Sequence, residues 1–142
     1  MGSDDVFDSA LRRAGAVRVR SFVELFSAAK CLASRYRPVG RRLAIVTNGG
    51  GPGVLAADWV SEIGLQLACL TPEQAQALRL QLSPLASLVD LIDVSEEAQA
   101  EQFRLAVEAA GQARQMDGIL VIYSPKSGVD SVSIAHAMLA VK

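Results

Sequence analysis

The sequence has few residues of the kinds that most often carry catalysis. A single histidine, His136, and only two cysteines, Cys31 and Cys69, occur in 142 residues. One histidine is too few for a histidine-based metal site or a Ser-His-Asp relay. The cysteines lie far apart, in a helical and in a strand pattern, so we expect buried free thiols. We therefore expect neither a catalytic residue nor a metal site within this chain.

An excess of charge and long apolar runs are also missing. The 14 basic and 15 acidic side chains give a formal net charge of -1, so the chain as a whole does not attract nucleic acid or anionic membranes. No apolar run approaches the roughly 20 residues of a membrane helix, and the acidic start MGSDDVFDSA does not resemble a signal peptide. We expect a cytoplasmic protein that binds neither nucleic acid nor membrane.

What is present is abundant apolar sequence, 51% of all residues, in two patterns separated by the linker-like stretch RPVGRR at 37–42. Before the linker we expect a helix at 4–14, a half-buried edge strand in VRVR at 17–20 and a helix from the N-cap Ser21 to about residue 36. We place a domain boundary between residues 1–37 and 38–142.

After the linker, strands alternate with helices. We expect strands at 43–48, 65–70, 88–94 and 118–124, and helices at 52–63, from Thr71, at about 95–115 and at about 130–141. This alternation predicts an α/β, flavodoxin-like parallel sheet with helices on both faces, and Trp59 in its core. Because the pattern stops without a closing strand, we expect a truncated piece of a larger polypeptide.

The stretch TNGGGPGVLAADW joins the first strand of this pattern to its helix. Its glycines permit a tight turn, and Pro52 suits the first helical turn. Free backbone N–H groups at a helix start, together with the helix dipole, bind anions without a basic side chain. The sequence therefore predicts an anion site, and its residues are Asn48, Gly49, Gly50, Gly51 and Gly53. A tight turn without a ligand is the alternative.

A nucleotide is a poor candidate for this anion. Gly51, Gly53 and Ala56 fit the dinucleotide fingerprint loosely, but the next strand does not end in the acidic residue that would bind a ribose. No Gly-Lys-Ser/Thr follows, which excludes a P-loop.

A second loop, YSPKSGVDS, follows the strand at 118–124 and lies beside the first loop if the two strands are neighbours. Its candidate ligand-binding residues are Ser124, Pro125, Lys126, Ser127 and Gly128. Lys126 is its only nearby charge and could equally be a solvated loop lysine. We expect Asp90 and Asp93 to bind backbone N–H groups near a strand end rather than a metal ion.

These residues carry a family resemblance. LAIVTNGGGPGVLAADWVSEIGLQLACLT, then VDL, then DGILVIYSP, resembles the ligase flavodoxin-like domain of NDP-forming acyl-CoA synthetases, the superfamily of succinyl-CoA synthetase. GSDDVFDSALRRAGAVRVRSFVELFSAAKCLASR is similar to the segment just after the phosphohistidine loop of those enzymes. The resemblance implies that 1–37 is the tail of the preceding CoA-ligase domain and that 38–142 is a flavodoxin domain truncated at its C-terminus.

The resemblance also implies a function. In these enzymes a histidine exchanges a phosphoryl group with an acyl phosphate, in a reaction that also involves CoA. The phosphohistidine then phosphorylates ADP or another NDP in a nucleotide-grasp domain. Residues 48–51 and Gly53 fall on a helix start that holds the phosphohistidine, and 124–128 falls on a loop that contacts the acyl or phosphate group. The implied partners are the phosphohistidine loop and the grasp domain, of the same protein or of a partner subunit, and acyl phosphate or acyl-CoA. A homo-oligomer of the chain is left open.

The chain departs from the family at three points. The phosphorylated histidine belongs a few residues before Gly2, so His136 cannot replace it and we expect the fragment alone to be inactive. Ser87 and Leu88 stand where the family commonly has Asn-Pro. The domains for CoA and nucleotide are missing, so we expect CoA, ADP or ATP and Mg²⁺ in the parent enzyme and no cofactor on this fragment. A similar region in bacterial protein lysine acetyltransferases gives the alternative function, a non-catalytic acyl-CoA sensor.

Overall fold

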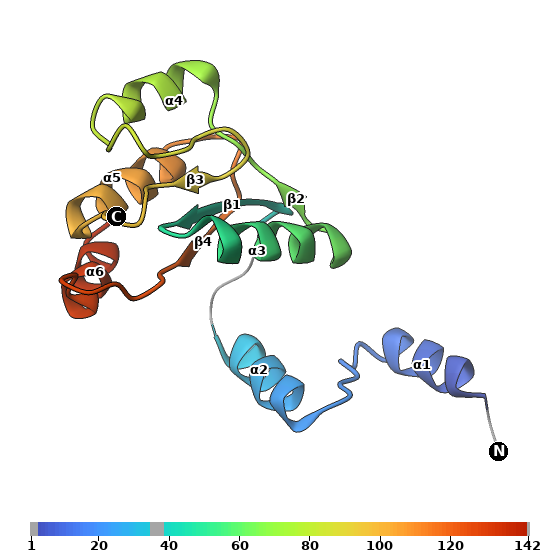
Figure 1. Ribbon diagram of the computed structural model, residues 1–142. Helices are drawn as coiled ribbons and strands as arrows, with labels where there is room; N and C mark the ends of the chain where they lie inside the picture. The colour runs from blue at the N-terminus through green and yellow to red at the C-terminus, as the bar shows by residue number, and fades with distance from the viewer. Residues whose placement is uncertain (1–2, 35–38, 142) are drawn as a thin grey trace. The chain divides into compact units, whose positions relative to one another are not determined.

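A computed structural model describes residues 3–34 and 39–141. The chain divides into two compact units, Met1–Arg37 and Pro38–Lys142 (Figure 1). The assignment of these units to two domains of the family remains a prediction. In the described ranges, no helix is both long enough and apolar enough to cross a membrane.

The first unit contains two helices, α1 (Asp4–Arg13) and α2 (Phe22–Ala33). Ser21 caps α2 as predicted, because its Oγ accepts a hydrogen bond from the N–H of Glu24 at 3.1 Å. The helix ends at Ala33, earlier than predicted, and the expected end near residue 36 lies outside the described residues.

The predicted strand at 17–20 is wrong. These residues form an extended connection without strand pairing, and no other segment of 3–34 is a strand. Instead, Arg18 turns back to α1, where its Nη2 donates to Oδ1 of Asp4 at 2.7 Å and its guanidinium lies 5.4 Å from the centre of the Phe7 ring. Alternating valine and arginine identifies a strand only where another strand is available for hydrogen bonding.

The second unit has the predicted alternation of strands and helices. Its elements are β1 (Arg42–Thr47), α3 (Gly50–Glu62), β2 (Gln66–Leu67), α4 (Pro72–Arg79), β3 (Ile92–Asp93), α5 (Ala100–Gly111), β4 (Gly118–Ile122) and α6 (Ser131–Leu139). Local signals set several boundaries, since Thr71 and Gln74 form a capping box at α4 and Gly64, with a φ of +75°, follows α3. The strands predicted at 65–70 and 88–94 are reduced to two residues each.

All four strands are parallel, and β1 is central. β4 pairs with β1 over five residues, from Leu43–Gly118 to Thr47–Ile122. β2 pairs with the beginning of β1 and β3 with its end, so both lie along the edge opposite β4. The ends of β1, β3 and β4 therefore meet at one side of the sheet, which confirms the flavodoxin-like arrangement expected from the sequence.

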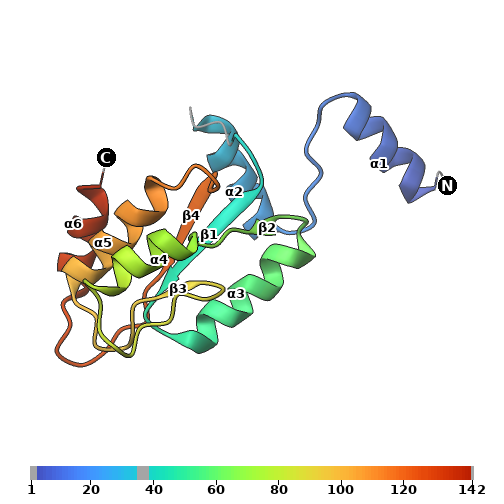
Figure 2. The ribbon, with the colours of Figure 1, turned by 90° about the horizontal axis from the view of Figure 1, so that it is seen from above.

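Helices cover both faces of the sheet. Figure 2 shows α3 on one face and α5, flanked by α4 and α6, on the other. Ala44, Ile45 and Val46 of β1 are fully buried, as expected for a strand covered on both sides. The main core lies between the sheet and α5, where Phe103 meets the ring of Tyr123 edge to face at a centroid distance of 5.9 Å.

An ion pair fixes the start of the sheet. Nε and Nη2 of Arg42 donate to the two carboxylate oxygens of Asp117 at 2.9 and 2.7 Å, and the N–H of Arg42 also donates to Asp117. The Arg42 guanidinium holds the pKa of Asp117 below its ordinary value. Arg42, assigned to the linker on sequence, thus belongs to β1 and connects it to the segment before β4.

Candidate functional site

The candidate site begins where β1 gives way to α3. Gly49 is the N-cap, and Thr47 closes the turn: its Oγ1 donates to the carbonyl of Gly49 at 3.0 Å and accepts from the N–H of Gly49 at 3.1 Å. A Cβ on Gly49 would lie 3.2 Å from Oγ of Ser124, so the two predicted loops approach each other closely here. Glycine permits this close approach.

Two backbone N–H groups at the start of α3, those of Gly50 and Gly51, have no acceptor among the described residues. Pro52 has no N–H, and the N–H of Gly53 donates to the carbonyl of Gly49 at 3.2 Å. The helix dipole places a partial positive charge at the same point. The start of α3 therefore offers two free donors to an anion.

The side chain of Asn48, a predicted anion ligand, is used for contacts within the protein. Its side chain is fully buried, its Nδ2 donates to the carbonyl of Ser124 at 2.9 Å, and its Oδ1 accepts from the N–H of Ser124 at 2.7 Å. Both polar atoms are thus engaged in holding the loop after β1 against the loop after β4. Asn48 therefore shapes the site through these two hydrogen bonds.

Gly53 also has a packing role. A Cβ at this position would lie 2.9 Å from Cγ2 of Thr47 and 3.4 Å from both methyl groups of Leu91. The absence of a side chain therefore lets α3 pack closely on β1. Gly51 differs, because a Cβ there would meet no atom within 4 Å.

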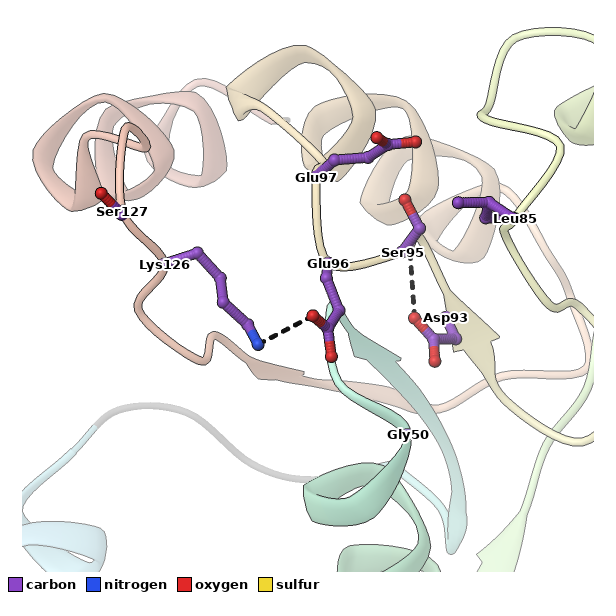
Figure 3. Close-up of a pocket in the computed structure, with 8 residues that line it drawn as sticks. All are labelled: Gly50, Leu85, Asp93, Ser95, Glu96, Glu97, Lys126 and Ser127. Atoms are coloured by element: carbon purple, nitrogen blue, oxygen red, sulfur yellow. Dashed lines mark hydrogen bonds and ion pairs between the residues drawn. The ribbon is translucent and has the colours of Figure 1, made fainter.

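An open cavity of about 600 Å³ lies beside the start of α3 (Figure 3). It is lined by Gly50, Leu85, Asp93, Ser95, Glu96, Glu97, Lys126 and Ser127. The structure thus brings both predicted loops to one cavity, through Gly50 on one side and Lys126 with Ser127 on the other. Pro125 and Gly128 lie next to these residues in the loop but do not line the cavity.

Charge of both signs faces this cavity. Nζ of Lys126 and Oε2 of Glu96 reach toward each other across it at 3.0 Å (Figure 3). Asp93 lies close to the start of α3, since a Cβ on Gly50 would lie 3.6 Å from its Oδ2, and its Oδ1 accepts from the N–H of Ser95. That hydrogen bond confirms the prediction that Asp93 binds a backbone N–H group near a strand end.

Ser95 was not singled out on sequence. It has a φ of +79°, in the left-handed region, it is 7% exposed, and its Oγ has no hydrogen-bond partner. Strained backbone and unsatisfied buried hydroxyls are both uncommon, and they concentrate at functional sites. No sequence signal could have revealed this, because the conformation of a serine after a strand is set by what surrounds it.

Several other candidates lie away from the cavity. His136 is exposed on α6, and the described residues contain no cluster of His, Cys, Asp or Glu suited to a metal ion. Cys31 and Cys69 are free, but the prediction that they are buried is wrong, since both are exposed. Trp59 was expected in the core and is 63% exposed on the outer face of α3.

The known proteins with similar sequences named below are ADP-forming CoA ligases. No protein-family model matches the chain. An ADP-forming acetate–CoA ligase I of Archaeoglobus fulgidus is 32% identical over 97% of this chain and 20% of its own length. An ADP-forming 4-hydroxybutyrate–CoA ligase of Nitrosopumilus maritimus is 24% identical over 98% of this chain and 20% of its own length.

A solved structure that superposes on this chain is an acetyl-coenzyme A synthetase. A dinucleotide forming acetyl-coenzyme A synthetase 1 of Ca. Korarchaeum cryptofilum, in complex with phosphate and ADP, superposes with a TM-score of 0.86 at 26% identity, over 99% of this chain and 30% of that one. These proteins give no support to the acetyltransferase alternative. The chain spans about a fifth of the length of the two curated relatives, and over nearly its whole length it is homologous to a part of the ADP-forming acyl-CoA ligases.

Proposed function

We propose that the chain supplies a helix start that holds a phosphoryl group in an NDP-forming acyl-CoA synthetase. The single observation that carries this proposal is the pair of free N–H groups of Gly50 and Gly51 at the opening of α3, beside a cavity reached by Lys126 and Ser127. Such a helix start stabilises negative charge through fixed dipoles.

The whole enzyme would interconvert acyl-CoA, NDP and phosphate with the free acid, CoA and NTP. The phosphoryl group would travel on a histidine from another loop of the enzyme, because His136, on α6, does not line the cavity. In that relay, Gly50 and Gly51 would bind the phosphoryl oxygens, and Asn48 would keep the two loops together. Mg²⁺, CoA and the nucleotide would be bound by other parts of the enzyme.

The charges in the cavity set a condition on anion binding. Three carboxylates, those of Asp93, Glu96 and Glu97, line it together with one ammonium group, that of Lys126. An anion at Gly50 therefore has to compete with Glu96 for Lys126. The free energy that it gains on binding also has to offset the repulsion from Asp93. We infer that this chain alone binds phosphate weakly, and that the remainder of the site comes from another part of the enzyme.

The acid substrate is the finer part of the proposal. The relatives named above act on acetate and on 4-hydroxybutyrate by name, so this superfamily accommodates different acids. In our chain, residues 124–128 would contact the acyl or phosphate group, with Lys126 and Ser127 facing it.

The test is a titration of the isotopically labelled chain with inorganic phosphate, followed by NMR. We expect saturable shifts of the Gly50 and Gly51 amide signals and none for Gly64, at the opposite end of α3. Lys126→Ala should weaken binding, whereas Glu96→Gln should tighten it, each by about twofold to fivefold, the range for a partly exposed ion pair. Saturable shifts confined to other amides, or none at all, would overturn the phosphoryl-binding role of α3.

A further inference from the structure

The outer face of α3 carries an apolar row that nothing in the described part of its own unit, 39–141, covers. Leu55 and Trp59 of α3 and its C-cap, Ile63, follow each other at intervals of four residues and are 66%, 63% and 62% exposed. Residues at this spacing lie on one side of a helix. We call these three residues the α3 ridge.

The α3 ridge faces away from the sheet. The buried residues of α3, Gly53 and Val60, lie on another side of the helix, and α3 packs mainly on β1 and β2. Isolated exposed apolar residues are ordinary on protein surfaces, but an unbroken row that includes a tryptophan marks an interaction surface.

The charge beside the ridge is of one sign. Asp58 and Glu62 lie next to the row, and the sequence of α3, Gly50–Glu62, contains no lysine or arginine. A second copy packed ridge to ridge would bring carboxylates against carboxylates. A partner whose apolar stripe is bordered by lysine or arginine would pair with them instead.

The shape of the ridge suits a helix. Side chains spaced by four form the ridges that fit into the grooves of a neighbouring helix. The relatives named above continue over several times the length of this chain, so more polypeptide accompanies the homologous segment in those proteins.

We infer that the α3 ridge is the docking surface for an amphipathic helix with a lysine- or arginine-bordered apolar stripe, contributed by another part of the synthetase. The helix would cover Leu55, Trp59 and Ile63, and its basic residues would pair with Asp58 and Glu62. This docking does not depend on whether the start of α3 binds a phosphoryl group.

The sequence contains a single tryptophan, so fluorescence reports directly on this surface. The experiment titrates the chain with two synthetic helical peptides that share a leucine stripe, one bordered by lysine and the other by glutamate. The lysine-bordered peptide should bind saturably and shift Trp59 emission to shorter wavelength, at least tenfold more tightly than the glutamate-bordered peptide. A phosphate titration of the same sample keeps the two proposals separate, because phosphate should leave the emission unchanged.

Variants locate the binding surface. Leu55→Ser combined with Ile63→Ser should abolish binding of the lysine-bordered peptide, whereas Leu139→Ser, at an exposed leucine of α6 on the other face of the sheet, should not alter it. Asp58→Lys combined with Glu62→Lys should reverse the preference in favour of the glutamate-bordered peptide. Circular dichroism checks that each variant remains folded.

Four results would overturn the inference. These are the absence of a saturable shift with either peptide, equal affinity for both peptides, binding that survives the double serine variant, and a concentration-dependent shift of the chain alone. The last result would identify a second copy as the occupant of the α3 ridge.

Discussion

The two helices that cover the central strand from opposite sides, α3 and α5, are used very differently. α5 buries four residues, Phe103, Ala106, Val107 and Ala110, and is itself flanked by α4 and α6. α3 buries only Gly53 and Val60 and leaves Leu55, Trp59 and Ile63 in solvent. Both helices have similar lengths and follow parallel strands, so the contrast does not come from their place in the topology.

The α5 side contributes mainly to the stability of the fold, whereas the α3 side is suited to interactions. The α5 side contains the main core, where apolar side chains are removed from water and stabilise the fold. The α3 side has a glycine-rich start with two free N–H groups and an uncovered apolar row, features that contribute little to folding and are suited to binding. Four substitution experiments can break or sharpen this contrast.

The largest effect is expected in the core. Phe103→Ala removes a fully buried ring that contacts Tyr123, and it should destabilise the fold by about 3–5 kcal/mol. The matched change on the other face, Trp59→Ala, should alter the free energy of unfolding by less than about 0.5 kcal/mol. Urea denaturation measures both, and a cost for Trp59→Ala close to that of Phe103→Ala would show that α3 is as much a core helix as α5.

The next effect distinguishes two glycines within α3. Gly53→Ala should cost about 1–3 kcal/mol, because its Cβ meets Thr47 and Leu91. Gly51→Ala should instead stabilise the chain by about 0.5 kcal/mol, since its Cβ has open space and alanine restricts the unfolded chain. Thermal unfolding midpoints measure the stability of both variants. An equal loss of stability in the two would contradict the assignment of close packing to Gly53 and open space to Gly51.

A smaller effect is expected in the turn that leads to α5. Ser95→Gly should be more stable than Ser95→Ala by about 1 kcal/mol, because both remove the unpaired hydroxyl but only glycine adopts a φ of +79° without strain. Chemical denaturation of the two variants side by side is the measurement. Equal stability would mean that the left-handed backbone at residue 95 is not strained.

The smallest effect concerns the segment between α5 and β4. Because Arg42 lowers the pKa of Asp117 from its ordinary value of 3.8, the ion pair stabilises the fold fully above that value. Its contribution falls as the pH drops below 3.8 toward the lower folded pKa. Asp117→Asn should therefore lower the unfolding midpoint near neutral pH, and the difference from the unsubstituted chain should shrink in acid. A constant difference across this pH range would mean that the effect is not electrostatic.

Sequence patterns predicted much of the fold and part of the site. The continuous apolar run of β1, the glycines after it and the capping residues of α4 predicted the alternation and the turn that precedes α3, because these signals act within a few residues. The same reasoning was wrong for 17–20 and for Trp59. In both cases the pattern identified an apolar side but not what would cover it.

The sequence by itself determined where chain direction changes and where a helix start with free N–H groups follows a buried strand, because the conformational limits of glycine and proline are local properties. Only the tertiary structure decided that Asn48 holds Ser124, that Ser95 takes a left-handed conformation, and that Gly53 packs on Leu91 while Gly51 faces open space. These outcomes depend on segments that are distant in sequence and meet only when β1 pairs with β3 and β4. The same physical reason explains why α5 became the core helix and α3 the exposed one.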